Sequence, residues 1–185
     1  MQRPMSSKEP LQRLESMKAE GPEKSAEVRW REALAMVATH ISEVFHVALT
    51  EIAILVKTKD GQSLRFVYPP ALAVGPNAFP LRVWSVAGNV LKSGTAFLDN
   101  SFAETKHLSF YEHVNLGGPK SGKIQKIMVV PLVSRIDNFG VVEVSRKGSN
   151  PVEAGPDFTS SELQRLANIV NTVAPYLEGL KPITL

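Results

Sequence analysis

Histidines and carboxylates are the side chains best suited to chemistry in this sequence, because it contains no cysteine. The chain therefore has no disulfide, no thiolate nucleophile and no cysteine-bound zinc. His107 and His113 lie in one stretch from which either could reach the iron of a haem, whereas His40 and His46 are not spaced as metal ligands. All four are more typical of surface or structural positions, so we predict no metal and no cofactor.

A stretch rich in glycine and lysine, GGPKSGK at residues 117–123, matches the start of a phosphate-binding loop. That loop needs a serine or threonine after its lysine to hold magnesium, and a helix whose N-terminus faces the phosphates. Here Ile124 follows the lysine and begins an apolar strand, so the mechanism fails. Together with Lys126 and Arg135, these lysines are more typical of a solvated loop and strand edge than of an anion-binding site.

Glu143 is a carboxylate within an apolar run, between Val142 and Val144. An ionised carboxylate in such surroundings costs several kcal/mol unless it is paired or solvated. Two placements satisfy this requirement, because the side chain either points into a polar cavity or reaches solvent at the face of a sheet. The sequence leaves both placements open.

Aromatic and polar side chains gather between Asp99 and Gly118 without the periodicity of a packed helix. Such a stretch is typical of a cover that closes on something other than the sheet beneath it. We predict ligand-binding residues in and around this cover: Trp84, Ser85, Asp99, Phe102, His107, Tyr111 and Glu143. No nucleophile, base and orienting group can be assembled from the sequence, so we predict that the protein is not an enzyme.

Helices are predicted where apolar residues recur every three or four positions. The longest are residues 23–45 and 158–177, and each carries a narrow, heptad-like apolar stripe. The stripes are Trp30, Leu34, Val37, Ile41 and Val44 in the first, and Leu163, Leu166, Val170, Val173 and Leu177 in the second. A short helix is predicted through residue 91, with Ser85 as its N-cap and Gly94 as the residue that ends it.

Residues 1–25 form a polar N-terminal extension with a possible short helix, in which Leu11, Leu14 and Met17 have helical spacing. This apolar stripe is too thin to stabilise a helix in water, so the helix either frays or docks on the rest of the chain. We expect the extension to be dispensable for the fold, because its apolar content is small against the cost of ordering it. Residues 26–181 are predicted to form a single domain.

Strands are predicted from apolar runs bounded by turn residues. Residues 52–56 are apolar on both faces, which places them at the centre of a covered sheet. An Asp60-Gly61 turn leads to residues 64–68, a strand that can lie at an edge. Residues 126–145 form a second hairpin, and residues 96–98 form a short strand.

Three strings of the sequence resemble segments of GAF domains, in the order and spacing of that family. They are SVAGNVLKSGTAFLDN (85–100), KIMVVPLVSRIDNFGVVEV (126–144) and FTSSELQRLANIV (158–170). The resemblance covers roughly residues 28–180 and implies an α+β fold, with a central antiparallel β-sheet of about six strands. It also implies N- and C-terminal helices on one face, a ligand-cavity cover on the other, and a small-molecule-sensing role in signalling.

The resemblance does not fix the ligand. Cyclic-nucleotide-binding members carry Asn-Lys after the last hairpin, then Phe and, after three intervening residues, Asp-Glu. The matching positions here are residues 145–147, Phe158 and residues 162–163, and Phe158 alone agrees. Members that bind bilins or reduce free methionine sulfoxide use cysteine, which excludes both activities. A cyclic-nucleotide or haem-binding sensor is therefore the third alternative.

The second alternative is a protein-interaction or dimerisation module that binds no ligand. Its cavity would be filled by bulky side chains of its own: Trp84, Phe97, Phe102, Phe110 and Tyr111. The two long helices share one narrow apolar spacing, and alanines beside the stripes would widen the apolar face: Ala33, Ala38, Ala167 and Ala174. We therefore predict a homodimer through the terminal helices.

Composition bounds the remaining partners. The formal net charge of +3 is small and does not indicate a nucleic-acid-binding surface. No apolar run approaches the roughly 20 residues of a membrane helix, and the N-terminus lacks the apolar core of a signal peptide. We predict a cytoplasmic protein that binds an unknown small molecule and neither nucleic acid nor membrane.

Overall fold

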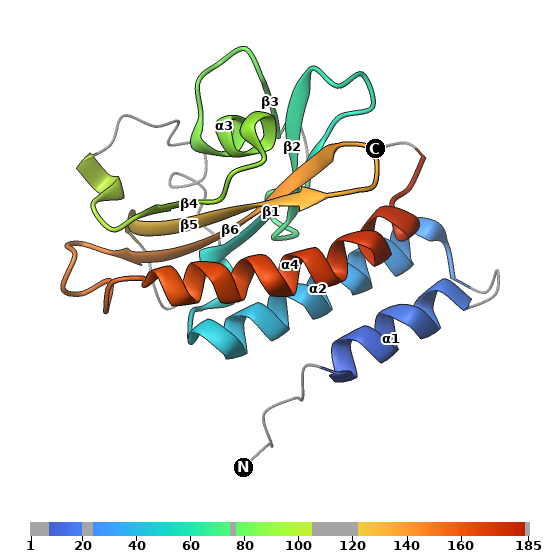
Figure 1. Ribbon diagram of the computed structural model, residues 1–185, viewed down its shortest axis with the longest axis horizontal. Coiled ribbons are helices and arrows are strands. Elements are labelled where there is room, and N and C mark those ends of the chain that lie inside the picture. The colour runs from blue at the N-terminus through green and yellow to red at the C-terminus, as the bar shows by residue number, and fades with distance from the viewer. Residues whose placement is uncertain (1–7, 20–23, 75–76, 105–121, 184–185) are drawn as a thin grey trace.

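The computed structural model describes residues 8–19, 24–74, 77–104 and 122–183. Within these ranges the chain forms a six-stranded sheet in the order β3-β2-β1-β6-β5-β4, and all neighbouring strands are antiparallel. Helices α2 and α4 lie along one face with α1 beside them, and α3 lies on the opposite face (Figure 1). The predicted α+β architecture is confirmed, with the terminal helices on one face of the sheet.

The helices are α1 (Lys8–Ala19), α2 (Ala26–Phe45), α3 (Val86–Ser93) and α4 (Ser160–Leu180). The strands are β1 (Ile52–Lys57), β2 (Ser63–Tyr68), β3 (Ala78–Pro80), β4 (Phe97–Asp99), β5 (Lys123–Val133) and β6 (Asn138–Gly148). Two short 3-10 helices are η1 (Leu49–Glu51) and η2 (Phe102–Glu104). None of the helices in the described ranges is long and apolar enough to cross a membrane.

Side chains at the helix ends explain why these helices begin where the sequence predicts. The hydroxyl oxygens of Ser25, Ser85 and Thr159 accept hydrogen bonds from the first turns of α2, α3 and α4. The Glu162 carboxylate accepts the Thr159 N–H at 2.7 Å, which completes a capping box. Gly94 ends α3 in the left-handed conformation, with a φ of 67°.

The centre of the sheet follows the prediction and its edge does not. β1 lies between β2 and β6, as its two apolar faces require. β2 lies one strand inside the edge, because β3 pairs with it through Leu64 and Phe79. The sequence did not reveal β3, since its three residues are too few for a period of two and end at Pro80.

The β1–β6 pair brings two backbones close together at Gly140. A β-carbon at this position would overlap the Leu55 carbonyl oxygen and lie 3.3 Å from Val56 Cα. Glycine is the residue that leaves room for this approach. The glycine in the string FGVVEV is therefore a packing requirement of the central strands.

The larger of two apolar clusters lies between the sheet and helices α1, α2 and α4. Both predicted stripes face it, and their buried members are Trp30, Leu34, Val37, Ile41, Leu166, Val170, Val173 and Leu177. Ala33, Ala38 and Ala174 are completely buried in the same cluster. These three alanines pack within the chain, so the expectation that they widen an exposed apolar face is wrong.

Helix α1 docks against α2 and α4 rather than fraying. Leu14 is completely buried and Met17 is 2% exposed, and the Tyr176 hydroxyl donates to the Glu15 carboxylate at 2.8 Å. This packing argues against the expectation that the extension is dispensable for the fold. Whether residues 26–181 form the domain by themselves stays a prediction.

Candidate functional site

The sheet face opposite α2 and α4 carries the second apolar cluster, on the side that the resemblance assigns to a ligand. Its floor consists of side chains from four strands: Ala53, Leu55, Leu64, Phe66, Ile127, Val129 and Val141. Helix α3 and η2 lie against this floor with Val86, Ala87, Val90, Leu91 and Phe102. The predicted cover is described as far as Glu104, and residues 105–121 lie outside the described ranges.

Glu143 lies on this floor, near the middle of β6. It pairs with Ala53 of β1 and Val129 of β5, and residues directly opposite each other in antiparallel strands point to the same face. The residue is 8% exposed. Of the two placements that the sequence left open, an open position at the face of the sheet is therefore excluded, and the side chain lies largely buried on the face that carries the second apolar cluster.

Burial changes the acidity of Glu143. The loss of water raises the pKa of its carboxyl from 4.5 to about 7, and the Lys147 ammonium opposes this rise as a smaller effect. Lys147 Nζ donates to the Thr50 carbonyl oxygen at 3.1 Å, and no described residue donates a hydrogen bond to the Glu143 carboxylate. Near neutral pH this group is thus able to accept or to donate a hydrogen bond.

A hollow of about 280 Å³ opens beside α3 and β4. Trp84 lines it and is 51% exposed, and the half-buried Phe97 lines it as well. The other lining residues are Val86, Asn89, Val90, Ser93, Thr95 and Ala96. Trp84 is the predicted ligand-binding residue that borders this hollow, whereas Glu143 does not border it.

The remaining predicted residues of this region support the local structure. Ser85 Oγ accepts the Gly88 N–H at 3.0 Å as the N-cap of α3. Asp99 Oδ1 accepts the Ser101 N–H at 2.7 Å where the chain turns from β4 towards η2. Phe102 is 4% exposed and packs in the apolar cluster, which is what the self-filled alternative requires of it.

Two of the predicted site residues, His107 and Tyr111, lie outside the described residues, as does His113. Among the described histidines, His40 is buried on α2 and His46 is exposed at its C-terminal end. Within the described ranges, no group of three His, Asp or Glu side chains is placed to hold a metal ion.

Two basic residues of the last hairpin, Lys126 and Arg146, are engaged within the chain. Lys126 is 4% exposed and forms an ion pair with Asp157 at 2.7 Å, so the expectation of a solvated edge is wrong for this residue. Arg146 lies 4.6 Å from the centroid of the Phe158 ring and donates to the Phe45 carbonyl oxygen at 3.4 Å. Phe158, the one match to the cyclic-nucleotide pattern, is thus a packing residue in this structure.

Comparison with known proteins gives matches of structure. No family model matches the sequence, and no curated protein matches it. The GAF domain of the phosphoenolpyruvate-protein phosphotransferase from Acinetobacter has a TM-score of 0.62 at 13% sequence identity, and the match covers 94% of this chain and 95% of that chain.

Two further solved structures match over a similar length. A segment of a methyl-accepting chemotaxis protein gives a TM-score of 0.66 at 12% identity, with 93% of this chain and 96% of that chain covered. The free methionine-R-sulfoxide reductase from Neisseria meningitidis, in complex with its substrate, gives 0.59 at 17% identity, with 94% and 89% covered. Likeness at these identities establishes the fold and nothing finer.

Proposed function

Because the chain has the GAF-domain fold, we propose that it is a small-molecule-sensing module of a signalling or regulatory protein. The proposed ligand lies between the second apolar cluster and the cover that begins at Asp99. We propose no catalytic role for this site, and we propose that the protein acts in the cytoplasm, as the sequence predicts.

The observation that carries the proposal is the buried carboxyl group of Glu143. A polar group on an apolar floor is costly unless it has a partner, and no described residue supplies a hydrogen bond. A ligand in the proposed cavity would supply that partner. The ligand expected here is a small molecule that offers an amide, amine or hydroxyl hydrogen to Glu143 and rests an apolar part on side chains such as Val129 and Val141.

A self-filled cavity is the rival from another functional class. The burial of Phe102 favours it, because this aromatic ring already occupies part of the space above the floor. The exposure of Trp84 favours the ligand, because that ring is free to contact a bound molecule that extends from the Glu143 floor to the hollow beside α3. A ligand-binding module should therefore change its Trp84 emission when the ligand is added, whereas a self-filled module should not.

Trp84 provides the test, because the chain has one other tryptophan, Trp30 on α2. In a Trp30→Phe variant we expect at least one saturable change of Trp84 emission when nucleotides, amino acids, 2-oxo acids and aromatic metabolites are screened. The dissociation constant obtained from this change should rise by roughly tenfold or more in Glu143→Leu, because the substitution removes a charge-assisted hydrogen bond. Tyr111→Ala should raise it too, if the proposed cover contacts the ligand.

Glu178→Leu is the matched control, because Glu178 is an exposed carboxylate near the end of α4. It should leave the Trp84 response unchanged. A flat screen, together with an unchanged melting temperature in the presence of every compound, would count against a ligand and in favour of the self-filled interaction module.

We further propose that the protein forms a homodimer through its terminal helices. A groove of about 290 Å³ lies among α1, α2 and α4, and its apolar side chains Leu11, Val44 and Ile169 are half-buried. A second copy would cover them.

Sedimentation velocity should give the mass of a dimer for the native chain and the mass of a monomer for Ile169→Glu. Asn171→Glu is the control and should remain a dimer. Monomeric native protein would contradict the proposal.

A further inference from the structure

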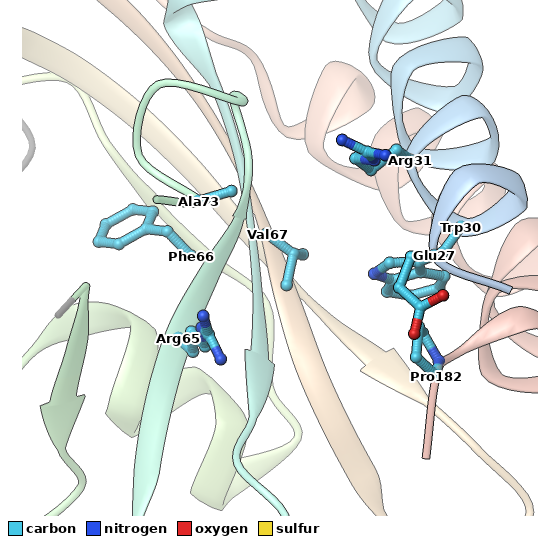
Figure 2. A pocket seen from close by; sticks show the side chains of 8 residues that line it. All are labelled: Glu27, Trp30, Arg31, Arg65, Phe66, Val67, Ala73 and Pro182. Carbon is cyan, nitrogen blue, oxygen red and sulfur yellow. The ribbon is translucent and has the colours of Figure 1, made fainter. Parts of the chain in front are cut away.

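A hollow of about 450 Å³ lies on the other side of the sheet, between the start of α2 and β2. Figure 2 shows Arg31 and Trp30 on the helix side and Val67 on the strand side, turned towards the space between them. The residues that line it are Glu27, Trp30, Arg31, Arg65, Phe66, Val67, Ala73 and Pro182. Of these residues, Phe66 also belongs to the floor of the site proposed above, and the others lie outside that site.

Two guanidinium groups give this hollow its charge. Arg31 is exposed on α2, and the half-buried Arg65 donates from Nε to Asn77 Oδ1 at 3.2 Å. In the described part of the chain neither of these side chains forms an ion pair, and Glu27 is the one carboxylate in the lining. The guanidinium group is planar and weakly hydrated, and it binds carboxylate and phosphate through paired hydrogen bonds.

The indole of Trp30 supplies an independent observation. The residue is 3% exposed, and its Nε1–H has no acceptor in the described part of the chain. A buried donor without a partner is costly, and most such groups in folded proteins are paired. In Figure 2 the nitrogen-bearing edge of the ring faces the hollow. An oxygen of a bound molecule at that edge would complete its hydrogen bonding.

We propose that this hollow binds a small organic oxyanion, a carboxylate or a phosphate monoester, with an apolar body. Arg31 and Arg65 hold the anionic group and the Trp30 N–H donates to one of its oxygens. The apolar body rests on Val67 and Pro182. The volume lies within the range of roughly 300–1,000 Å³ that small-molecule sites occupy. This site is separate from the one under α3, so neither proposal depends on the other.

A Trp84→Phe variant tests this proposal, because it leaves Trp30 as the sole tryptophan. The variant is titrated with phenyl phosphate and, separately, with benzoate, and Trp30 emission is excited beyond the absorption of both probes. We expect a saturable change with at least one probe. Arg31→Gln in the same background should raise the dissociation constant by roughly tenfold, since it removes a charged donor.

Arg135→Gln is the matched control, because Arg135 is an exposed arginine in the β5–β6 turn and does not line the hollow. It should leave both titrations unchanged. Arg65→Gln gives a second variant from the opposite wall of the hollow, with a loss similar to that of Arg31→Gln. A flat titration with both probes overturns the proposal, and so does an equal loss of affinity in Arg31→Gln and Arg135→Gln.

Discussion

Replacing Val170 with lysine should lower the free energy of unfolding by about 3 to 5 kcal/mol, the usual cost of an uncompensated buried charge. Val170 lies on α4, is completely buried and belongs to the larger apolar cluster. The side chains that share this cluster with Val170 are apolar and cannot compensate a new ammonium group. The loss is a large share of the 5 to 15 kcal/mol that typically stabilises a domain.

Chemical denaturation at constant temperature measures this loss directly, and the midpoint of thermal unfolding should fall by roughly 10 °C. Asn171→Lys is the control, since Asn171 is the exposed next residue on the same helix. It adds the same charge outside the core and should change stability by less than about 0.5 kcal/mol. Equal stability of the two variants would mean that the apolar stripe of α4 does not face the sheet.

Local signals explain why so much of this fold follows from the sequence. Each long helix combines an apolar stripe with a capping side chain, and α3 has both Ser85 and Gly94 at its ends. β1 is apolar on both faces, which requires cover on both sides and therefore a central position. Periodicity and caps are set within a few residues, so they are readable without the tertiary structure.

Features that depend on distant segments could not be predicted in the same way. The helical spacing of Leu14 and Met17 predicts a helix, but their burial depends on α2 and α4, which the short stripe does not reveal. The same holds for the alanines of the two long helices, because the same spacing serves packing within a chain and packing between chains. β3 is a strand because it pairs with β2, and its own three residues carry no alternation of apolar and polar side chains that would predict a strand.

The residues of the candidate sites also differ in whether a local sequence signal reveals them. An acidic residue inside an apolar strand stands out, so Glu143 is identifiable from the sequence. The face of the sheet on which it lies follows only from the register of β6 with β1 and β5. Trp84 is predicted at a ligand site and lines a hollow in the structure, whereas Phe97, which lines the same hollow, is predicted only as a filler of the self-filled cavity. The hollow between Arg31 and Arg65 left no sequence signal, because two arginines on different elements meet only when α2 packs beside β2.

Replacing Glu143 with glutamine should remove a pH dependence from the stability of the protein. Burial raises the pKa of this carboxyl from 4.5 to about 7, so the folded state holds a proton that the unfolded state releases. Native stability should therefore fall as the pH rises between these two values and level off above the higher one. Relative to Glu143→Gln, the native protein should lose about 2 to 3 kcal/mol between about pH 5 and about pH 8.

Urea denaturation of both proteins at the two pH values gives this difference, and the comparison also cancels the other titrating groups. His40 is the important one, because burial lowers its pKa and makes stability rise with pH below 6.5, the opposite sign. That contribution is the same in both proteins. Parallel pH profiles would mean that the Glu143 carboxylate is paired or solvated, which would remove the observation on which the sensing function rests. A ligand that donates to the carboxylate should instead shrink the difference near pH 8, because it stabilises the ionised form in the folded state.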